Sequence, residues 1–275
     1  EPDATATGMS SDDFTRGQAW YDLVIEVDPN DKNTIYAGGI DLFKSSNSGS
    51  SWNQLSYWHL YYGSPYVHAD QHAIVFRSGS SSDVVFGNDG GVYYSSNANT
   101  GSPAFTNRNF NYNVTQFYAC AMHPGSATDY YLAGSQDNGS QQFNNPGINS
   151  TVEVTGGDGA FCFIDQDNPT YQITSYVYNS YRRSVNSGSS FSSIQDDQTT
   201  GKFINPTDYD NNQNILFSSR TTNTIQRINN ITGTINIDYI TVSGMVDMAT
   251  HIRVSEYTNS SSTVFVGTGA GDIFK

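Results

Sequence analysis

The sequence predicts an all-β chain, a β-propeller of about six four-stranded blades that is incomplete or part of a larger propeller. The prediction depends on short alternating apolar runs, an internal repeat of roughly 45 residues and a turn pattern that occurs twice. Helical periodicity is absent, and Gly, Asn and Pro punctuate the short runs, as in all-β proteins. A repeat of this length with three or four strands is typical of propeller blades.

Length and composition fit this fold. The chain has 275 residues, which is normal for one all-β propeller, so the sequence predicts a single domain over residues 1–275. Aromatic residues make up 13% of the chain and include 19 tyrosines, and such side chains suit the half-buried surfaces of strands. No run approaches the roughly 18 apolar residues of a transmembrane helix, so no membrane span is expected.

The charge of the chain restricts its partners. Acidic residues outnumber basic residues 26 to 12, which gives a formal net charge of −14. Such a field repels phosphate backbones and anionic membrane surfaces, so we expect no nucleic-acid partner. Cations, neutral glycans and basic proteins are the partners that this charge favours.

The chain divides into six repeats. In each repeat an apolar strand is followed by a second strand that ends in Gly, a tight turn and a third strand that ends at Ser. The predicted blades cover residues 21–67, 68–114, 115–155, 156–198, 199–242 and 243–275. The last blade is incomplete, because residues 271–275 repeat the pattern of residues 39–44 and then stop. Either residues 1–20 supply a closing outer strand or, as we prefer, the chain is a fragment of a longer protein, since an open sheet edge needs cover.

One turn pattern occurs twice, about three repeats apart. Residues 45–52 read Ser-x-Asn-x-Gly-x-x-Trp and residues 184–191 read Ser-x-Asn-x-Gly-x-x-Phe. The short polar side chains can bind their own backbone, and Gly supplies a positive φ. The pattern resembles the Asp-box (BNR) hairpin of sialidases, sortilin-type propellers and xyloglucanase-type glycosidases, with Asn in place of Asp. The resemblance implies a structural turn on the face opposite the active face.

A wider resemblance covers about residues 17–195. The segments GQAWYD (17–22), HADQH (68–72), GNDGG (87–91), QDNG (136–139) and GGDG (156–159) carry it. They resemble secreted BNR-propeller proteins of gliding, polymer-degrading bacteria of the Bacteroidetes type. The resemblance implies a propeller fold and a secreted or cell-surface location, and it implies no particular activity.

The motifs fall at two kinds of loop. Residues 20–22, 68–72, 116–118 and 156–159 precede the first strand of a blade, and residues 88–91 and 136–139 join a second strand to a third. In a propeller these loops share the face at the mouth of the channel, whereas the turns at 45–52 and 184–191 lie on the other face. We therefore expect the acidic residues and histidines of these motifs to gather at one rim.

The segment His68-x-Asp70-x-His72 is the leading metal candidate. In an extended chain, alternate residues project to one side, and two imidazoles with a carboxylate can bind Zn²⁺ or another transition metal. Alternatively, these side chains hydrogen-bond neighbouring loops and close the top of the channel.

Asp89, Asp137 and Asp158 have three interpretations. Each lies beside or near Gly, so each can be a turn former whose carboxylate caps backbone N–H groups. Several carboxylates around one mouth could instead hold Ca²⁺, or complete the shell of the His68–His72 metal. As catalytic residues, two of them, with Asp22 or Asp70, could form the acid and base pair of a glycoside hydrolase.

Other side chains on the same loops are candidate ligand contacts. Aromatic rings can stack on sugars, and polar groups beside them can bind hydroxyls; more often, such rings pack within blades or cover loops. We expect the ligand-binding set to be Trp20, Tyr21, Asp22, Tyr118 and Gln136, and the aromatic segment 58–62 is a further candidate. Arg182 and Arg183 could pair with acids or with a ligand carboxylate.

The two cysteines leave two alternatives open. Cys120 and Cys162 lie in the apolar runs FYACAMH and AFCFID. They are either two buried free thiols or one disulfide between neighbouring blades, and a chain of this size does not need a disulfide to fold.

These observations favour an extracellular propeller module that binds a glycan, a metal ion or a protein on its acidic face. Further partners are the remainder of its own longer polypeptide. The alternatives are a glycoside hydrolase with paired Asp residues and a metal-dependent enzyme centred on His68, Asp70 and His72. Sialidase activity is disfavoured because the chain has 12 basic residues and no F/Y-R-I-P motif. No nucleophile elbow, P-loop or dinucleotide fingerprint is present in the sequence.

Overall fold

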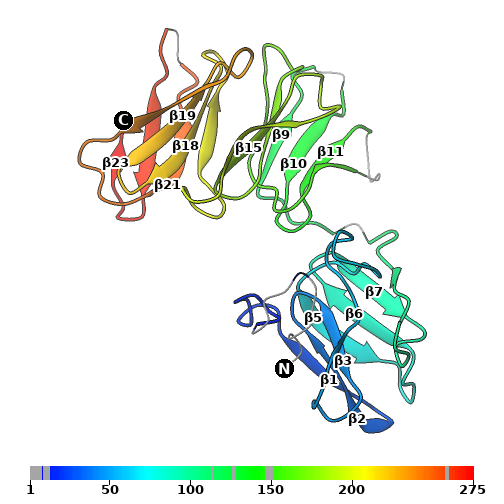
Figure 1. The fold of residues 1–275 in the computed structure, drawn as a ribbon. Coiled ribbons are helices and arrows are strands. Elements are labelled where there is room, and N and C mark those ends of the chain that lie inside the picture. Colours follow the sequence, from blue (N-terminus) through cyan, green and yellow to red (C-terminus); the bar gives the residue numbers. More distant parts are fainter. Residues whose placement is uncertain (1–7, 9–12, 113, 126–127, 146–150, 258–259) are drawn as a thin grey trace. The chain divides into compact units, whose positions relative to one another are not determined.

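The computed structural model describes residues 8, 13–112, 114–125, 128–145, 151–257 and 260–275. Within these ranges the chain consists of strands, turns and irregular segments, with no helix (Figure 1). Accordingly, none of the described segments is a helix with the length and apolarity needed to cross a bilayer. The predicted closing strand from residues 1–20 falls mostly outside the described residues.

The chain forms two compact units, residues 1–114 and residues 115–275. Each unit is built from antiparallel sheets whose strands follow one another in sequence order, the arrangement of propeller blades. The prediction of one domain over residues 1–275 stays a prediction, and the two units are described separately below.

The first unit contains two four-stranded sheets (Figure 1). The first sheet has β1 (Val24–Asp28), β2 (Asp31–Gly38), β3 (Leu42–Ser45) and β4 (Asn53–Gln54). The second has β5 (Gln71–Phe76), β6 (Val84–Asn88), β7 (Gly91–Ser95) and β8 (Thr106–Asn107).

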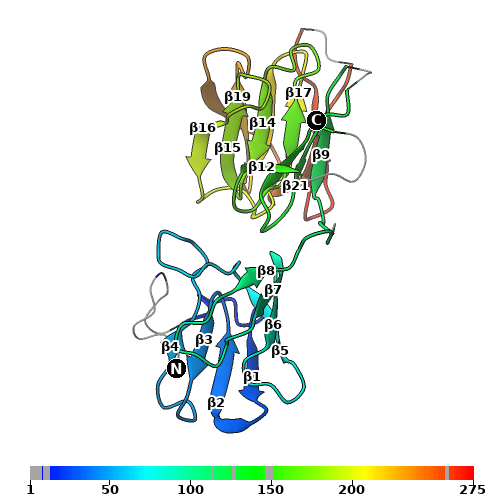
Figure 2. The same ribbon diagram turned by 90° about the vertical axis from the view of Figure 1, so that its right-hand side faces the viewer.

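The second unit contains three four-stranded sheets and one three-stranded sheet. Sheets that follow one another in the sequence are neighbours, as Figure 1 shows from the side and Figure 2 from one end of the row. The third sheet has β9 (Ala119–Met122), β10 (Tyr131–Gly134), β11 (Ser140–Phe143) and β12 (Val152–Thr155). The fourth has β13 (Cys162–Ile164), β14 (Gln172–Ser175), β15 (Asn179–Ser184) and β16 (Ser192–Asp197). The fifth has β17 (Thr207–Asp210), β18 (Ile215–Thr221), β19 (Thr224–Asn229) and β20 (Asn236–Thr241), and the sixth has β21 (Ala249–Val254), β22 (Val264–Thr268) and β23 (Ile273–Phe274).

Hydrophobic cores lie between successive sheets of each unit. In the first unit, Tyr36 and Leu42 of the first sheet pack with Ile74 and Phe86 of the second. In the second unit, separate clusters join the third sheet to the fourth, the fourth to the fifth and the fifth to the sixth. Thin cores between short-stranded sheets are what radial blades produce. The predicted fold class, all-β with about six propeller blades, is confirmed, although the described part of the sixth sheet has three strands.

A buried amide network crosses between the fourth and fifth sheets. Asn179 is fully buried, and its Oδ1 accepts hydrogen bonds from Asn205 Nδ2 and Ser218 Oγ, both at 2.8 Å. Its Nδ2 donates to the carbonyl of Ser219 and to Thr200 Oγ1, both at 3.0 Å. Both ends of the amide therefore have partners, which is what a buried polar group needs in a packed interior.

The two matching turns have the same hydrogen bonds. Ser45 Oγ accepts from the amide of Gly49 at 2.8 Å, and Ser184 Oγ accepts from the amide of Gly188 at 2.9 Å. In both turns the Asn Oδ1 accepts from the amide four residues later. The two turns join β3 to β4 and β15 to β16, so both connect the third and fourth strands of a blade, as predicted.

A third copy of this turn follows β7. Asn97 Oδ1 accepts from Ser95 Oγ at 3.1 Å and from the amide of Ala104 at 2.8 Å. The sequence comparison missed it because the turn is longer, and only the Ser-x-Asn start is shared with the other two.

Both cysteines are free. Cys162 is buried, and burial raises the pKa of its thiol to about 12. Cys120 is exposed on β9, so the expectation of two buried thiols is wrong for this residue. The reason is the alternation of β9, in which Cys120 and Met122 face outward while Ala119 and Ala121 are half-buried.

Candidate functional site

Three loops of the first unit meet at one end of its sheets: residues 13–22, residues 68–72 and the β6–β7 turn. The Tyr21 hydroxyl donates to the carboxylate of Asp89, with 3.0 and 3.1 Å to its two oxygens. His72 Nε2 lies 2.6 Å from Asp89 Oδ1, and the Tyr21 and His72 rings are in edge contact at 4.8 Å. The structure therefore brings the predicted residues Tyr21, His72 and Asp89 together.

The two glycines after Asp89 lie where the structure leaves no room for a side chain. A Cβ at Gly90 would stand 2.3 Å from the ring of His68, and a Cβ at Gly91 would stand 2.2 Å from Asn109 Oδ1. Gly91 also has a φ of +106°, which favours glycine. The GNDGG segment therefore closes the β6–β7 turn tightly enough to aim Asp89 toward the loop at 68–72.

The predicted metal triad does not converge. Asp70 has a φ of +64°, so the segment is not the extended chain that would align residues 68, 70 and 72 on one side. Within the described ranges, no three ligand atoms from His68, Asp70 and His72 come within 4.8 Å of one another. His68 instead packs on Gly90, and His72 pairs with Asp89.

The segment between the histidines also has a structural role that the sequence did not reveal. Gln71 is fully buried, and its Nε2 donates to the carbonyl of His68 at 2.5 Å. Its Oε1 accepts from Asn88 Nδ2 at 3.3 Å. This amide ties the loop at 68–72 to the end of β6, which carries the turn of Asp89.

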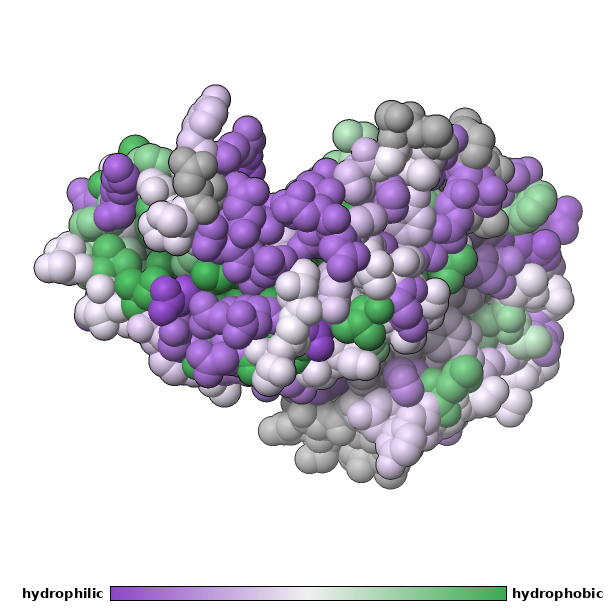
Figure 3. Space-filling model, turned by 90° about the horizontal axis from the view of Figure 1, so that it is seen from above, coloured by the Kyte–Doolittle hydropathy of each residue, from purple (hydrophilic) through white to green (hydrophobic). Residues whose placement is uncertain are grey.

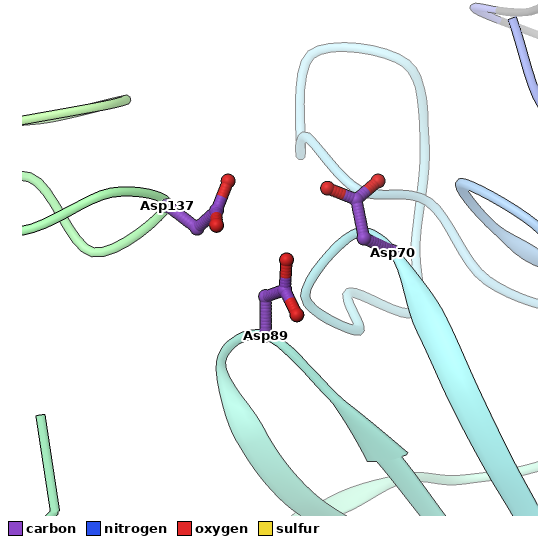
Figure 4. A group of neighbouring side chains, drawn as sticks. All are labelled: Asp70, Asp89 and Asp137. Atoms are coloured by element: carbon purple, nitrogen blue, oxygen red, sulfur yellow. The ribbon is translucent and has the colours of Figure 1, made fainter. Parts of the chain in front are cut away.

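Buried carboxyl groups lie beneath these loops. Asp22 is fully buried and Asp70 is 9% exposed. Burial, followed by the nearby Asp70 carboxylate, raises the pKa of Asp22 to about 7. Burial, followed by the Asp89 carboxylate, raises the pKa of Asp70. Figure 4 shows the Asp70 carboxyl at the start of β5 and the Asp89 carboxyl at the β6–β7 turn; oxygens of the two lie within 4.8 Å.

Asp41 is a further buried acid that the sequence analysis missed. It lies between β2 and β3, is fully buried, and accepts a hydrogen bond from Gln54 Nε2 at 2.9 Å. Burial raises its pKa to about 8. Gly38, Gly39 and Ile40 before it resemble an ordinary turn. Only an acidic residue at the same loop position in other repeats could have indicated that Asp41 is special.

Aromatic side chains border the same end of the first unit. Trp20 is 84% exposed and lies 5.7 Å from the Tyr21 ring. In the segment 58–62, Tyr61 is 85% exposed and the Arg16 guanidinium lies 5.9 Å from the centre of the Trp58 ring. Elsewhere, the surface in Figure 3 is mostly hydrophilic, with hydrophobic residues in small groups.

The motifs of the second unit are tied into its backbone. The Asp158 carboxylate accepts from the amide of Asp137 at 3.1 Å, and the amide of Gly139 donates to the carbonyl of Gly157 at 2.7 Å. A Cβ at Gly159 would stand 2.2 Å from the carbonyl oxygen of Gly139. Asp158 thus acts as the turn-forming interpretation expects, by holding the 136–139 turn against the 156–159 loop.

Two more predicted ligand contacts of the second unit bind each other. The Tyr118 hydroxyl donates to Gln136 Oε1 at 2.6 Å, on an exposed part of this unit. Arg183 donates to the carbonyls of Ile231 and Gly233, both at 2.8 Å, which is a structural role. A rim shared by the motifs of both units stays a prediction.

Comparison with known proteins gives no family. No protein-family model matches the chain, and no curated protein matches it either.

Solved structures with a similar course of the chain have low sequence identity. An ancestral GH74 enzyme is 17% identical, with a TM-score of 0.45 over 93% of this chain and 38% of its own. The GH74 xyloglucanase from Xanthomonas campestris is 11% identical, with a TM-score of 0.40 over 91% of this chain and 52% of its own. YCF48 bound to D1 peptide is 11% identical, with a TM-score of 0.39 over 85% of this chain and 71% of its own. The chain thus spans about half or less of the length of the two GH74 proteins.

Proposed function

We propose that this chain is a saccharide-binding propeller module of an exported protein, and that the loop end of its first unit contacts the glycan. The observation that carries the proposal is the exposed Trp20 beside Tyr21, whose hydroxyl is bound to Asp89. An apolar ring next to fixed polar groups is the usual composition of a small-molecule site. Secretion or a cell-surface location is part of the proposal and depends on the motif resemblance.

The acidic balance of the chain indicates the kind of glycan. With 26 acidic and 12 basic residues, the protein repels polyanions at ordinary ionic strength. Asp89 and His72 can accept from and donate to sugar hydroxyls, whereas a uronic-acid polymer would face the carboxylate of Asp89. The proposed ligand is therefore a neutral polysaccharide.

Affinity electrophoresis in gels that contain neutral polysaccharides tests the proposal. We expect at least one polymer to retard the wild-type chain, and Trp20→Ala to abolish most of the retardation. Tyr257→Ala is the matched control, because Tyr257 is a 92% exposed aromatic residue of the second unit. The proposal would be contradicted by an equal loss of retardation in both variants, or if no neutral polymer retards the wild type.

A glycoside hydrolase is the second candidate. Oxygens of the Asp70 and Asp89 carboxyl groups lie no more than 4.8 Å apart, and retaining glycosidases need two carboxyl groups no farther apart than about 5 Å. Asp70 and Asp22, however, are too deeply buried for a sugar to reach, which favours binding over hydrolysis. Release of reducing ends from the bound polysaccharide by the wild type, and its loss in Asp89→Asn, would make the chain an enzyme.

A further inference from the structure

Lys44, Gln142 and Arg183 occupy one shared position in the third strands of three sheets. Each is paired across the sheet with a buried hydrophobic residue of the second strand. The pairs are Tyr36–Lys44, Leu132–Gln142 and Ile173–Arg183. Paired residues project from the same face of a sheet, and each of these hydrophobic residues belongs to the core that joins its sheet to the next one in the sequence. The three polar side chains therefore project toward the following sheet.

Lys44 donates to the outer turn of the second sheet, the turn that joins its third strand to its fourth (residues 96–105). Lys44 Nζ lies 3.1 Å from the carbonyl oxygen of Ala98, and it also donates to the carbonyl of Thr100. The residue is 4% exposed, and its ammonium group lies 5.7 Å from the centre of the Tyr36 ring. A buried ammonium group has donors and no acceptor, so it needs oxygens of this kind in order to stay charged.

Arg183 and Gln142 make the corresponding contact in the second unit. Arg183 Nη1 donates to the carbonyls of Ile231 and Gly233, both at 2.8 Å, in the outer turn between β19 and β20. Gln142 Nε2 donates to the carbonyl of Gly188 at 3.2 Å, in the outer turn between β15 and β16. A Cβ at Gly188 would stand 2.5 Å from that same Nε2, so the close approach requires glycine. In all three cases the donor lies in one sheet and its acceptors lie in the outer turn of the next.

We propose that Lys44, Gln142 and Arg183 are latches that hold the outer turn of the following sheet closed. Each latch supplies a donor to carbonyl oxygens at the junction between two sheets, where an unpaired oxygen is costly. The outer turn then opens only when the donor of the preceding sheet releases it, so neighbouring sheets of one unit open together. The proposal is independent of saccharide binding, because none of the three latches belongs to the loops of Trp20 and Asp89.

The alternative is that each outer turn is held closed by its own hydrogen bonds. In the turn after β15, Ser184 Oγ accepts from the amide of Gly188 at 2.9 Å, and Asn186 Oδ1 accepts from the amide of Ser190 at 3.0 Å. If such local bonds were sufficient, loss of a donor in the preceding sheet would leave the turn closed. The latch and the local bonds therefore predict different rates of turn opening after the same substitution.

Amide hydrogen exchange of the native full chain, followed by mass spectrometry, measures this opening. In Arg183→Met, exchange should become at least tenfold faster in the outer turn of the fifth sheet, because two carbonyls lose their donor. The amides of Ile231 and Gly233 in this turn are hydrogen-bonded, so their exchange reports its opening. Exchange in the outer turn of the variant's own sheet, residues 185–191, should stay within twofold of the wild type.

Arg227→Met is the matched control. Arg227 has the same position in β19, where it is paired with Phe217, and its substitution removes the same charge from the same unit. Its guanidinium group, however, binds Asp238 of its own sheet through two contacts of 2.7 Å at a partly exposed site. Such a pair contributes little, so exchange in the outer turn of the fifth sheet should stay within threefold of the wild type, although Arg227 is closer to it in the sequence.

Lys44→Met and Gln142→Met extend the experiment to the other two latches. The first should accelerate exchange at least tenfold in residues 96–105, and the second, which removes one longer hydrogen bond from a neutral donor, about threefold in residues 185–191. The proposal is wrong if Arg183→Met leaves the exchange of the next outer turn unchanged, if it accelerates its own outer turn equally, or if the control variant has the same effect. If Lys44→Met does not fold, the other two variants decide.

Discussion

Two buried polar side chains, one in each unit, are satisfied in opposite ways. Asn179 of the second unit is fully buried and has partners for both its oxygen and its nitrogen. Asp22 of the first unit is equally buried, and no described residue donates to either of its oxygens. The first arrangement stabilises a junction between sheets, whereas the second is costly whenever the carboxyl group carries its negative charge. The hydrogen-bond partners of a buried polar group, and not its burial alone, therefore distinguish a structural role from a functional one.

The largest expected effect separates these two residues. Asn179→Ala removes the acceptor of Asn205 and Ser218 and leaves a cavity, so we expect a loss of about 3 kcal/mol in the free energy of unfolding. Asp22→Asn should leave the free energy unchanged or raise it, because the amide never carries the unsupported charge. Urea unfolding followed by far-UV circular dichroism measures both values. Similar losses of unfolding free energy in the two variants would show that Asp22 is as much a structural residue as Asn179.

The second effect is a dependence of stability on pH in the first unit. Burial raises the pKa of Asp41 from 3.8 to about 8. The unfolded chain therefore loses this proton near pH 4, while the folded chain keeps it until about pH 8. The stabilisation is complete below pH 4 and is lost progressively as the pH rises to 8.

Tryptophan fluorescence can follow this decline, because Trp20, Trp52 and Trp58, the three tryptophans of the chain, all lie in the first unit. From pH 4 to pH 8 the urea midpoint of the wild type should fall, and Asp41→Asn should reduce the slope. The slope that remains in this variant comes from Asp22, whose pKa burial also raises. Asp31→Asn should leave the slope unchanged. A slope that is the same in Asp41→Asn and the wild type would show that other groups cause it.

The sequence could predict the features that follow from the order of the strands and from turn chemistry. The repeat, the turns at 45–52 and 184–191 and the approach of Tyr21 to Asp89 follow from strand order and turn chemistry, so they could be predicted. The metal triad could not, because the spacing of residues 68–72 does not reveal the positive φ of Asp70. Asp41 was missed because its burial arises from contacts with β4 and the loop after it, and the residues around Asp41 in the sequence do not reveal these contacts.

The third effect compares the two Asp-containing loop motifs. Asp158→Ala leaves the amide of Asp137 without its acceptor, so we expect a loss of about 1.5 kcal/mol. Asp89→Ala breaks contacts between side chains that water can replace, so its loss should be below about 1 kcal/mol. Denaturant unfolding of both variants measures the difference. The reverse order would mean that the Asp89 cluster is mainly structural.

The smallest effect concerns two tyrosine hydroxyls. Tyr21 donates to the carboxylate of Asp89, whereas Tyr118 donates to the neutral amide of Gln136. Hydrogen bonds to charged groups are the stronger kind, so Tyr21→Phe should cost more than Tyr118→Phe, with both losses at or below about 0.5 kcal/mol. Denaturant unfolding of the two variants measures both losses. An equal or larger loss in Tyr118→Phe would show that the carboxylate of Asp89 does not strengthen its hydrogen bond with Tyr21.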